Sequence, residues 1–150
     1  APLVQLLSRR SALPLDEAHH GEPLNRGTIY VAPADTHLVV SEEEVLFLTH
    51  DPPVHHTRPS ADVLLESMAR SFGPRAIAVV LSGAGTDGAD GCAAIKDAGG
   101  TVLAQDPETA QSPGMPRAVV NRGLADEILS LDELAPRLTE LVHEAEENRG

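Results

Sequence analysis

The sequence is poor in aromatic residues and in cysteine, and each shortage narrows the classes of protein it can encode. Aromatic residues make up 2% of the chain and tryptophan is absent, so no aromatic platform is available on which nucleic-acid bases could stack. The lone cysteine, Cys92, has no partner in the chain for a disulfide. No histidine lies near it in the sequence, so we interpret Cys92 as a small core residue and not as a catalytic thiol.

Basic residues and long apolar runs are also scarce. Eleven Lys and Arg against 23 Asp and Glu give a formal net charge of −12, which disfavours phosphate backbones and anionic lipid surfaces as partners. No apolar run approaches the roughly 20 residues that span a bilayer, and the first residues lack the pattern of a secretory signal. We therefore expect no nucleic-acid partner, no membrane insertion and a cytoplasmic location.

The remaining composition is that of one globular domain. The chain has 150 residues, of which 41% are hydrophobic, enough to bury a core of Ala, Val, Leu and Ile. Apolar spacing predicts a first helix over residues 2–10. Short alternating segments broken by Gly, Pro and Asp then predict a β-hairpin region near residues 15–50.

Beyond residue 58 the pattern alternates between helix and strand. A helix is predicted from Ser60 as N-cap up to a stop at Gly73 and Pro74. A strand over 76–81 follows that is apolar on both faces, as in a central parallel strand. A helix over 88–98, a strand over 101–104, a short helix after 114, an edge strand over 125–129 and an amphipathic helix over 131–147 follow. The fold class predicted is α/β: a doubly wound, mostly parallel sheet flanked by helices, with right-handed crossovers.

The Gly-rich run at residues 82–91, SGAGTDGADG, directly follows the predicted buried strand and holds the acid Asp87. Ligands and catalytic groups collect at the carboxyl ends of parallel strands, and three interpretations of this loop stay open. It can be a tight turn with Asp87 as a helix cap. It can bind a nucleotide or phosphate, although the P-loop lysine is missing and the only acid at a suitable distance is Asp106. It can also hold Asp87 where it orients a catalytic histidine.

The serines and histidines do not complete a site by their spacing. Ser82 follows the strand but lies outside any G-x-S-x-G turn. The histidine pairs at 19–20 and 55–56 lack the spacing of metal ligands, so we expect exposed loop residues, no metal site and no cofactor. His37 follows a turn fixed by Pro33 and Asp35. We expect it near a site, as a hydrogen-bonded structural histidine.

Five segments together resemble one family. Residues 29–37, 58–62, 80–91, 104–106 and 114–118 are similar, in this order, to the blocks of the CheB-type protein-glutamate methylesterase catalytic domain of bacterial chemotaxis. The resemblance covers nearly the whole chain. It implies a carboxyl-ester hydrolase that removes methyl groups from receptor glutamates, and in many relatives deamidates glutamines, by a Ser-His-Asp mechanism.

By this resemblance, Asp87 is the aspartate of the triad. A loop near the site and two further site-proximal residues, His37 and Met115, are also implied. The members of that loop are Ser82, Gly83, Ala84, Gly85, Thr86 and Gly88. Ala84 stands where the family commonly has methionine, a departure that can alter how the substrate side chain is held.

The serine and histidine of the family lie upstream of the segments matched here. We therefore expect residues 1–150 to form a single methylesterase-like catalytic domain that is incomplete at its N-terminal side and inactive alone. The expected partners are the cytoplasmic helices of methylated chemoreceptors and, in some architectures, a receiver domain. The alternatives are a non-catalytic binding module with an esterase fold, and nucleotide or phosphate binding at the Gly-rich loop.

Overall fold

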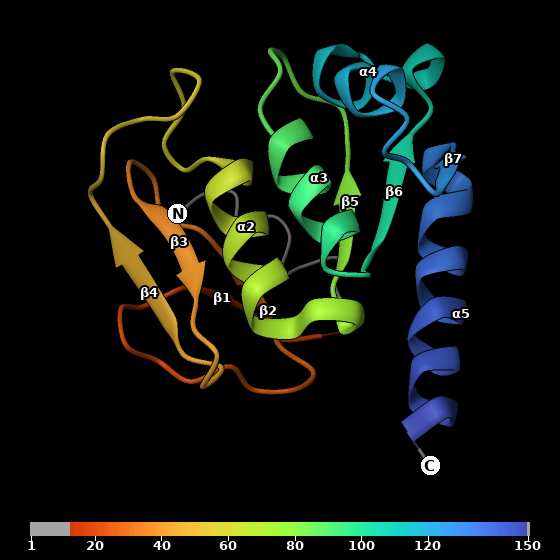
Figure 1. Ribbon diagram of the computed structural model, residues 1–150. Coiled ribbons are helices and arrows are strands. Elements are labelled where there is room, and N and C mark those ends of the chain that lie inside the picture. The colour runs from red at the N-terminus through yellow and green to blue at the C-terminus, as the bar shows by residue number, and fades with distance from the viewer. Residues whose placement is uncertain (1–12, 150) are drawn as a thin grey trace.

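A three-stranded parallel sheet forms the centre of the molecule (Figure 1). The structure, a computed structural model, describes residues 13–149; the helix predicted over residues 2–10 lies outside them. Strands β5 (Ile77–Val80), β6 (Thr101–Gln105) and β7 (Glu127–Leu129) lie in that order and run parallel. Helices α3 (Ala89–Asp97) and α4 (Gly114–Asn121) make the two crossovers. This confirms the α/β class and the alternation predicted beyond residue 58.

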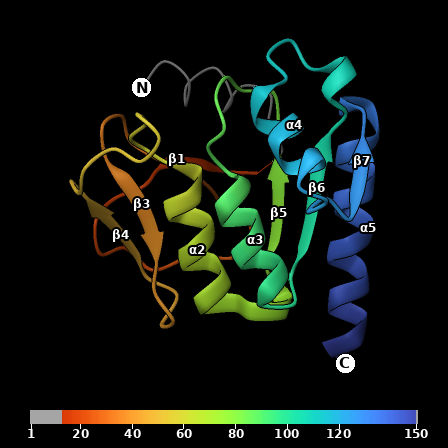
Figure 2. The same ribbon diagram turned by 45° about the horizontal axis from the view of Figure 1, so that its top comes forward.

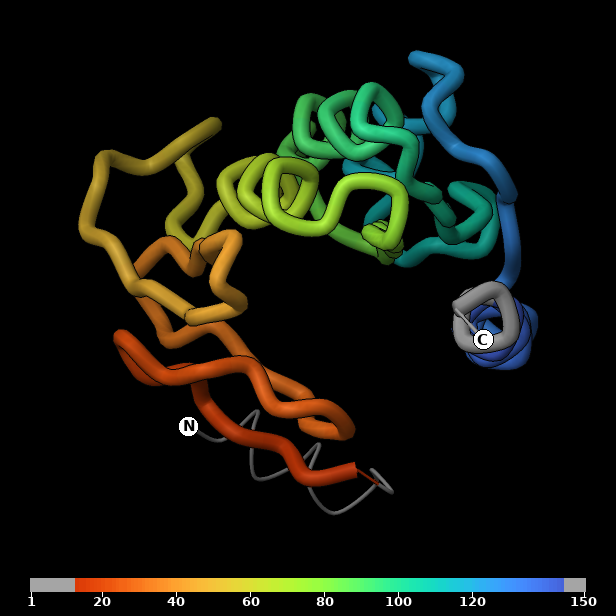
Figure 3. The backbone as a smooth tube through the Cα atoms, turned by 60° about the horizontal axis from the view of Figure 1, so that its bottom comes forward, coloured from red at the N-terminus to blue at the C-terminus, as the bar shows by residue number. Residues whose placement is uncertain are grey.

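Helices cover both faces of this sheet. On one face, small and branched side chains of β5 and β6 pack against α2 (Ala61–Phe72), α3 and α4. The opposite face carries α5 (Leu131–Arg149), and Figure 3 shows α5 and α3 on opposite sides of the sheet. The buried members of the core are Leu65, Ala69, Ala76, Ala78, Val80, Ala89, Cys92, Ile95, Val102, Ala104 and Val119. The core thus contains no aromatic residue among its buried members, as the composition predicts.

The N-terminal strands form a second, smaller layer. Strands β3 (His37–Val40) and β4 (Leu46–Thr49) pair antiparallel, which confirms the predicted hairpin for this part. Strands β1 (Leu15–Glu17) and β2 (Ile29–Val31) instead run parallel, because residues 18–28 carry the chain back to the end at which β1 began. Helix α2 packs against both β3 and α3, so it joins the two layers.

Helix α2 begins and packs as its sequence predicts. The Ser60 side chain accepts a hydrogen bond from the Val63 N–H and caps the helix. On the face toward α3, a Cβ atom added at Gly91 would lie 2.6 Å from the Cβ of Leu65, a distance that real Cβ contacts do not reach. The absence of a side chain at position 91 therefore sets how closely α2 and α3 approach.

Strand β5 differs from the prediction of a central strand. Among the described strands its only neighbour is β6, so its other edge has no partner there. Val79 and Leu81 are 36% and 47% exposed, although both were predicted to be buried. Helix α5 forms where predicted and buries Leu134, but Val142 on its expected apolar face is 43% exposed. The apolar pattern thus marks surfaces that the described residues cover only in part.

Within residues 13–149, no helix combines the length and the apolar composition that a bilayer span requires.

Cys92 is predicted to be chemically inert in the folded protein. Its side chain is fully buried, and this burial, together with the nearby charge of Asp62, raises the pKa of the thiol to about 11. Because the thiolate is the reactive form, iodoacetamide at pH 8 should leave Cys92 unmodified until the protein is unfolded in guanidinium. Peptide mass spectrometry measures this, and rapid native-state alkylation of Cys92 would contradict its assignment to the core.

Candidate active site

Asp87 lies at the edge of the sheet where the parallel strands end, and its carboxylate is held by the start of α2. Asp87 is 5% exposed. Its Oδ1 accepts hydrogen bonds from the Ser60 hydroxyl at 2.7 Å and from the Asp62 N–H at 3.5 Å, and its Oδ2 accepts one from the Ala61 N–H at 2.5 Å. The free N–H groups and the positive dipole end of a helix stabilise an acidic group at this position. The buried carboxyl group is therefore well supplied with donors.

Asp62, in the first turn of α2, makes the reciprocal contact with α3. Its Oδ1 accepts hydrogen bonds from the Gly88 N–H at 2.9 Å and the Gly91 N–H at 2.8 Å. Gly88 is the N-cap of α3 with φ of +105°, a backbone conformation that favours glycine. The loop acid thus sits at the N-terminus of α2, while an acid of α2 sits at the N-terminus of α3.

The two acids also affect each other electrostatically. Burial raises the pKa of the Asp62 carboxyl above its ordinary value, and the adjacent Asp87 raises it further, while the N–H groups of Gly91 and Gly88 act in the opposite direction. A raised pKa in the folded state means that the folded protein binds this proton more tightly than the unfolded chain does. Ionisation of Asp62 as the pH rises therefore reduces the free energy of unfolding. Burying this carboxyl beside Asp87 thus has a cost in stability.

His37, the first residue of β3, connects the β3–β4 hairpin to the start of α2. It is fully buried, and its Nδ1 accepts a hydrogen bond from the Ser60 N–H at 3.2 Å. This partner leaves the proton on Nε2, which donates to the carbonyl of Pro52 at 2.9 Å. Both ring nitrogens are occupied, so His37 reaches Asp87 only through Ser60 and is the hydrogen-bonded structural histidine that the sequence analysis expects.

Ser82 lies at the start of the loop and anchors it. Its N–H donates to Oε1 of the buried Gln105 at 2.9 Å, and its hydroxyl oxygen accepts a hydrogen bond from the Ser112 N–H at 2.8 Å while donating to the Ser112 carbonyl at 3.2 Å. Figure 2 brings this end of the sheet forward, where the loop after β5, residues 106–113 and α4 meet. The hydroxyl of Ser82 is thus engaged in holding two loops together.

A pocket of about 350 Å³ lies beside Asp87, and Met115 forms part of its wall. The Met115 N–H donates to the Gly83 carbonyl at 2.9 Å, and a Cβ at Gly83 would clash with the Met115 sulfur. The other lining residues are mostly apolar: Ala32, Leu38, Thr57, Pro59, Ser60, Ala61 and Leu64. Ala84, Gly85 and Thr86 form the exposed tip of the loop. The pocket is therefore a mostly apolar hollow with Asp87 in its lining.

Short contacts join the five segments singled out in the sequence. Asp35 pairs with Arg58, whose guanidinium contacts one carboxylate oxygen at 2.8 and 3.0 Å. His37 and Asp87 both bind Ser60, Gln105 binds Ser82, and Met115 binds Gly83. From the sequence, Ser60 is predicted only as a helix cap, and Asp62 is not singled out. The signal for both is the S-x-D pattern at the start of α2, but its partner is 25 or more residues away.

The fold is that of a known α/β catalytic domain. The structure superposes on the crystal structure of the Thermotoga maritima CheB methylesterase catalytic domain with a TM-score of 0.89 and 36% sequence identity, covering 93% of this chain and 76% of that one. The family model described as CheB methylesterase matches residues 1–138. The chain belongs to the CheB methylesterase family, which confirms the resemblance inferred from the five segments.

Two curated relatives agree with this family. The chain is 46% identical over 138 residues to protein-glutamate methylesterase/protein-glutamine glutaminase 2 of Caulobacter vibrioides, covering 89% of this chain and 40% of that protein. It is 42% identical over 140 residues to the protein-glutamate methylesterase FrzG of Myxococcus xanthus, covering 93% of this chain and 42% of that protein. The chain therefore spans about two-fifths of the length of the curated relatives it matches.

Replacing Ser60 by alanine is predicted to destabilise the fold. The change removes the cap of α2 and one donor to the buried Asp87 carboxylate, so the free energy of unfolding should fall by about 1–3 kcal/mol. Urea unfolding followed by circular dichroism measures it. The control is Thr139→Ala, which removes an exposed hydroxyl bonded within α5 and should change stability by less than about 0.5 kcal/mol. Equal effects of the two substitutions would contradict the role given to Ser60.

Proposed function

We propose that this chain carries the acid of a Ser-His-Asp triad in a protein-glutamate methylesterase, and that Asp87 is that acid. The reaction is hydrolysis of methyl esters on glutamate side chains of chemoreceptor cytoplasmic helices, with glutamine deamidation as a second activity. The observation that carries the proposal is the buried Asp87 carboxylate, held by α2 beside a pocket, in a chain that belongs to the CheB methylesterase family.

The proposed chemistry is acyl transfer to a serine. The serine oxygen attacks the ester carbonyl while a histidine takes its proton, and the same histidine then protonates the leaving methanol. Water hydrolyses the acyl-enzyme to free glutamate in the reverse sequence of proton transfers. Asp87 accepts a hydrogen bond from the imidazole, fixes its tautomer and stabilises the imidazolium. A carboxylate offers about four acceptor sites, so the three donors of α2 leave room for one more.

The open edge of β5 supports an incomplete domain. Among the described strands β5 pairs only with β6, and Val79 and Leu81 are exposed beside that edge. Further parallel strands of the parent protein that paired with β5 would bring their carboxyl ends, and a serine and a histidine on them, to the edge at which Asp87 lies.

The proposed location is the cytoplasm, and the proposed further partner is a receiver domain.

The Gly-rich loop is a poor phosphate site. An anion at the N-terminus of α3 would need the N–H groups of that first turn. The N–H groups of Gly88 and Gly91 already donate to the buried Asp62 carboxylate, and Asp106, the acid expected to bind a ribose, caps the 3-10 turn η2 (Pro107–Thr109). Both contacts favour the triad role of Asp87 over nucleotide binding.

Replacing Asp87 by asparagine in the full-length protein is predicted to lower kcat for methanol release from a methylated receptor by about 10³–10⁴-fold, because the imidazole loses its acceptor and its correct tautomer. The rate is measured by release of labelled methanol. The control is Asp132→Asn, an exposed acid in the first turn of α5, which should leave kcat unchanged. Circular dichroism of both variants verifies folding, and full activity of a folded Asp87→Asn variant would exclude the proposal.

A fluorophosphonate probe tests where the nucleophile lies. Residues 1–150 alone should not be labelled, because the Ser82 hydroxyl is engaged with Ser112 and has no activating base, whereas the full-length protein should be labelled at a serine upstream of residue 1. Gel fluorescence and peptide mass spectrometry report the labelled serine. Labelling of Ser82 in either chain would make Ser82 the nucleophile and overturn this assignment.

A further inference from the structure

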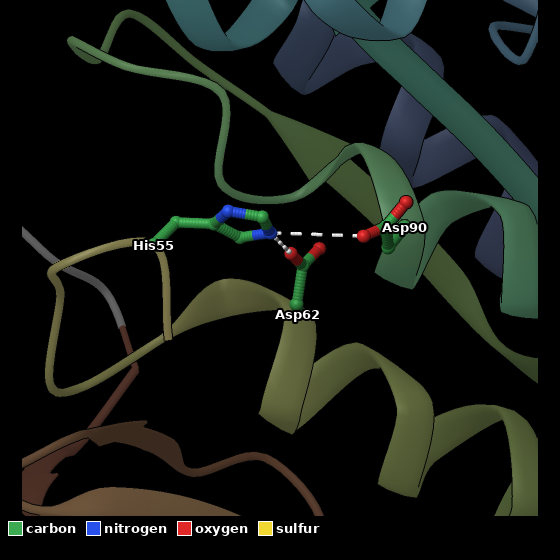
Figure 4. Close-up of side chains that lie close together, drawn as sticks. All are labelled: His55, Asp62 and Asp90. Carbon is green, nitrogen blue, oxygen red and sulfur yellow. Dashed lines mark ion pairs between the residues drawn. The ribbon is translucent and has the colours of Figure 1, made fainter. Parts of the chain in front are cut away.

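The side chains of His55, Asp62 and Asp90, from three separate elements, lie close together (Figure 4). His55 lies in a turn between β4 and α2 that is closed by the bridge between Val54 and Thr57, while Asp62 and Asp90 lie in the first turns of α2 and α3. The His55 Nε2 lies 3.3 Å from Asp62 Oδ2 and 3.6 Å from Asp90 Oδ2. One ligand atom from each residue falls within 4.8 Å of the other two.

In both Asp62 and Asp90, protein donors bind Oδ1, so Oδ2 is the oxygen directed toward His55. Asp62 Oδ1 is bound by the N–H groups of Gly88 and Gly91. Asp90 Oδ1 is bound by the Arg122 guanidinium at 2.8 Å. The Oδ2 atoms of both acids therefore face His55, as Figure 4 shows. This is the arrangement in which outer contacts orient metal-binding carboxylates.

The Asp62 carboxylate also points to a cation at this place, independently of the distances. The residue is 2% exposed, and its Oδ2 is buried without a hydrogen-bond partner. A buried carboxylate oxygen without a donor is costly unless a cation balances it. The nearest groups on the open side are the His55 ring and Asp90, so the unpartnered oxygen points into the cluster.

We propose that His55, Asp62 and Asp90 bind a divalent transition-metal ion of the zinc class. With metal–ligand bonds of about 2.0–2.2 Å, tetrahedral donors lie roughly 3.3–3.6 Å apart. The two separations from His55 Nε2, 3.3 and 3.6 Å, match this spacing, and the two carboxylate oxygens lie within 4.8 Å of each other. One imidazole and two carboxylates suit zinc, manganese or cobalt, whereas magnesium and calcium prefer oxygen ligands alone.

The fourth coordination position opens toward solvent. His55 and Asp90 line a pocket of about 290 Å³, together with Thr86, Asn121 and Arg122, so a water molecule can complete the tetrahedron. This pocket shares no residue with the pocket beside Asp87 and Met115. An ion here lies outside the pocket beside Asp87 and ties the turn at His55 to the first turns of α2 and α3.

Zinc binding to the full-length protein tests the proposal without any activity assay. The protein is stripped with EDTA, dialysed, and titrated with ZnCl₂ by calorimetry, with the thermal unfolding midpoint measured in parallel. We expect a site that is lost on mutation of the cluster, a higher midpoint on saturation, and visible absorption typical of tetrahedral Co²⁺ after loading with cobalt. His55→Ala and Asp90→Asn should each weaken this site at least tenfold, and both side chains are partly exposed, so the variants should fold.

The matched control is His56→Ala, which removes the neighbouring histidine and should leave zinc affinity unchanged. Two results would overturn the proposal. The first is zinc affinity that is the same in His55→Ala, Asp90→Asn and His56→Ala, which would place the ion elsewhere. The second is no binding at millimolar zinc, which would make the cluster an ion pair between a protonated His55 and two carboxylates. Neither result depends on whether Asp87 serves in a triad.

Discussion

The exchange of acids between two helix N-termini is the contact on which the rest of the structure depends. Asp87, from the loop that precedes α3, accepts hydrogen bonds from the start of α2, and Asp62, from α2, accepts hydrogen bonds from the start of α3. An acid of α2 thus binds the free N–H groups at the start of α3, and an acid of the loop before α3 binds those at the start of α2. Because α2 also packs on the hairpin layer and α3 on the sheet, this single exchange fixes the position of both layers and of Asp87.

The exchange explains why five separate segments are needed to build one site. Asp87 needs Ser60, and Ser60 needs His37 to accept its N–H. The loop that carries Asp87 needs Gln105 and Met115 to hold its first residues. These contacts are made between residues far apart in the sequence. The family pattern is therefore the sequence trace of one hydrogen-bonded network and not five independent signals.

Local order was predictable from the sequence and tertiary contacts largely were not. The start of α2 follows from Ser60, and the α/β alternation follows from apolar periodicity, because both depend on neighbouring residues. The parallel pairing of β1 and β2 and the edge position of β5 depend on which strands meet, and periodicity does not encode this. The apolar side chains of Val79 and Leu81 predicted burial, but among the described residues nothing covers them fully and both are exposed.

In the candidate site too, some residues could be found from the sequence and others could not. Asp87 could be found because it follows a buried strand, and the family resemblance gave it a role. Its partner Asp62 could not be found, since an acid in the first turn of a helix is ordinary. His55 was expected to be an exposed loop residue, and it is partly exposed, but its ring approaches two acids that lie seven and thirty-five positions further along the chain.

Gly91 is constrained although it lies outside the pocket beside Asp87. The same residue lets Leu65 approach through its missing side chain and binds Asp62 through its N–H. Any side chain at this position would separate α2 from α3 and withdraw Asp62 from the turn that presents Asp87. Position 91 is therefore constrained by packing and by hydrogen bonding at once. A substitution at this position would act on Asp87 from a distance, through the spacing of two helices and not through a contact with its carboxylate.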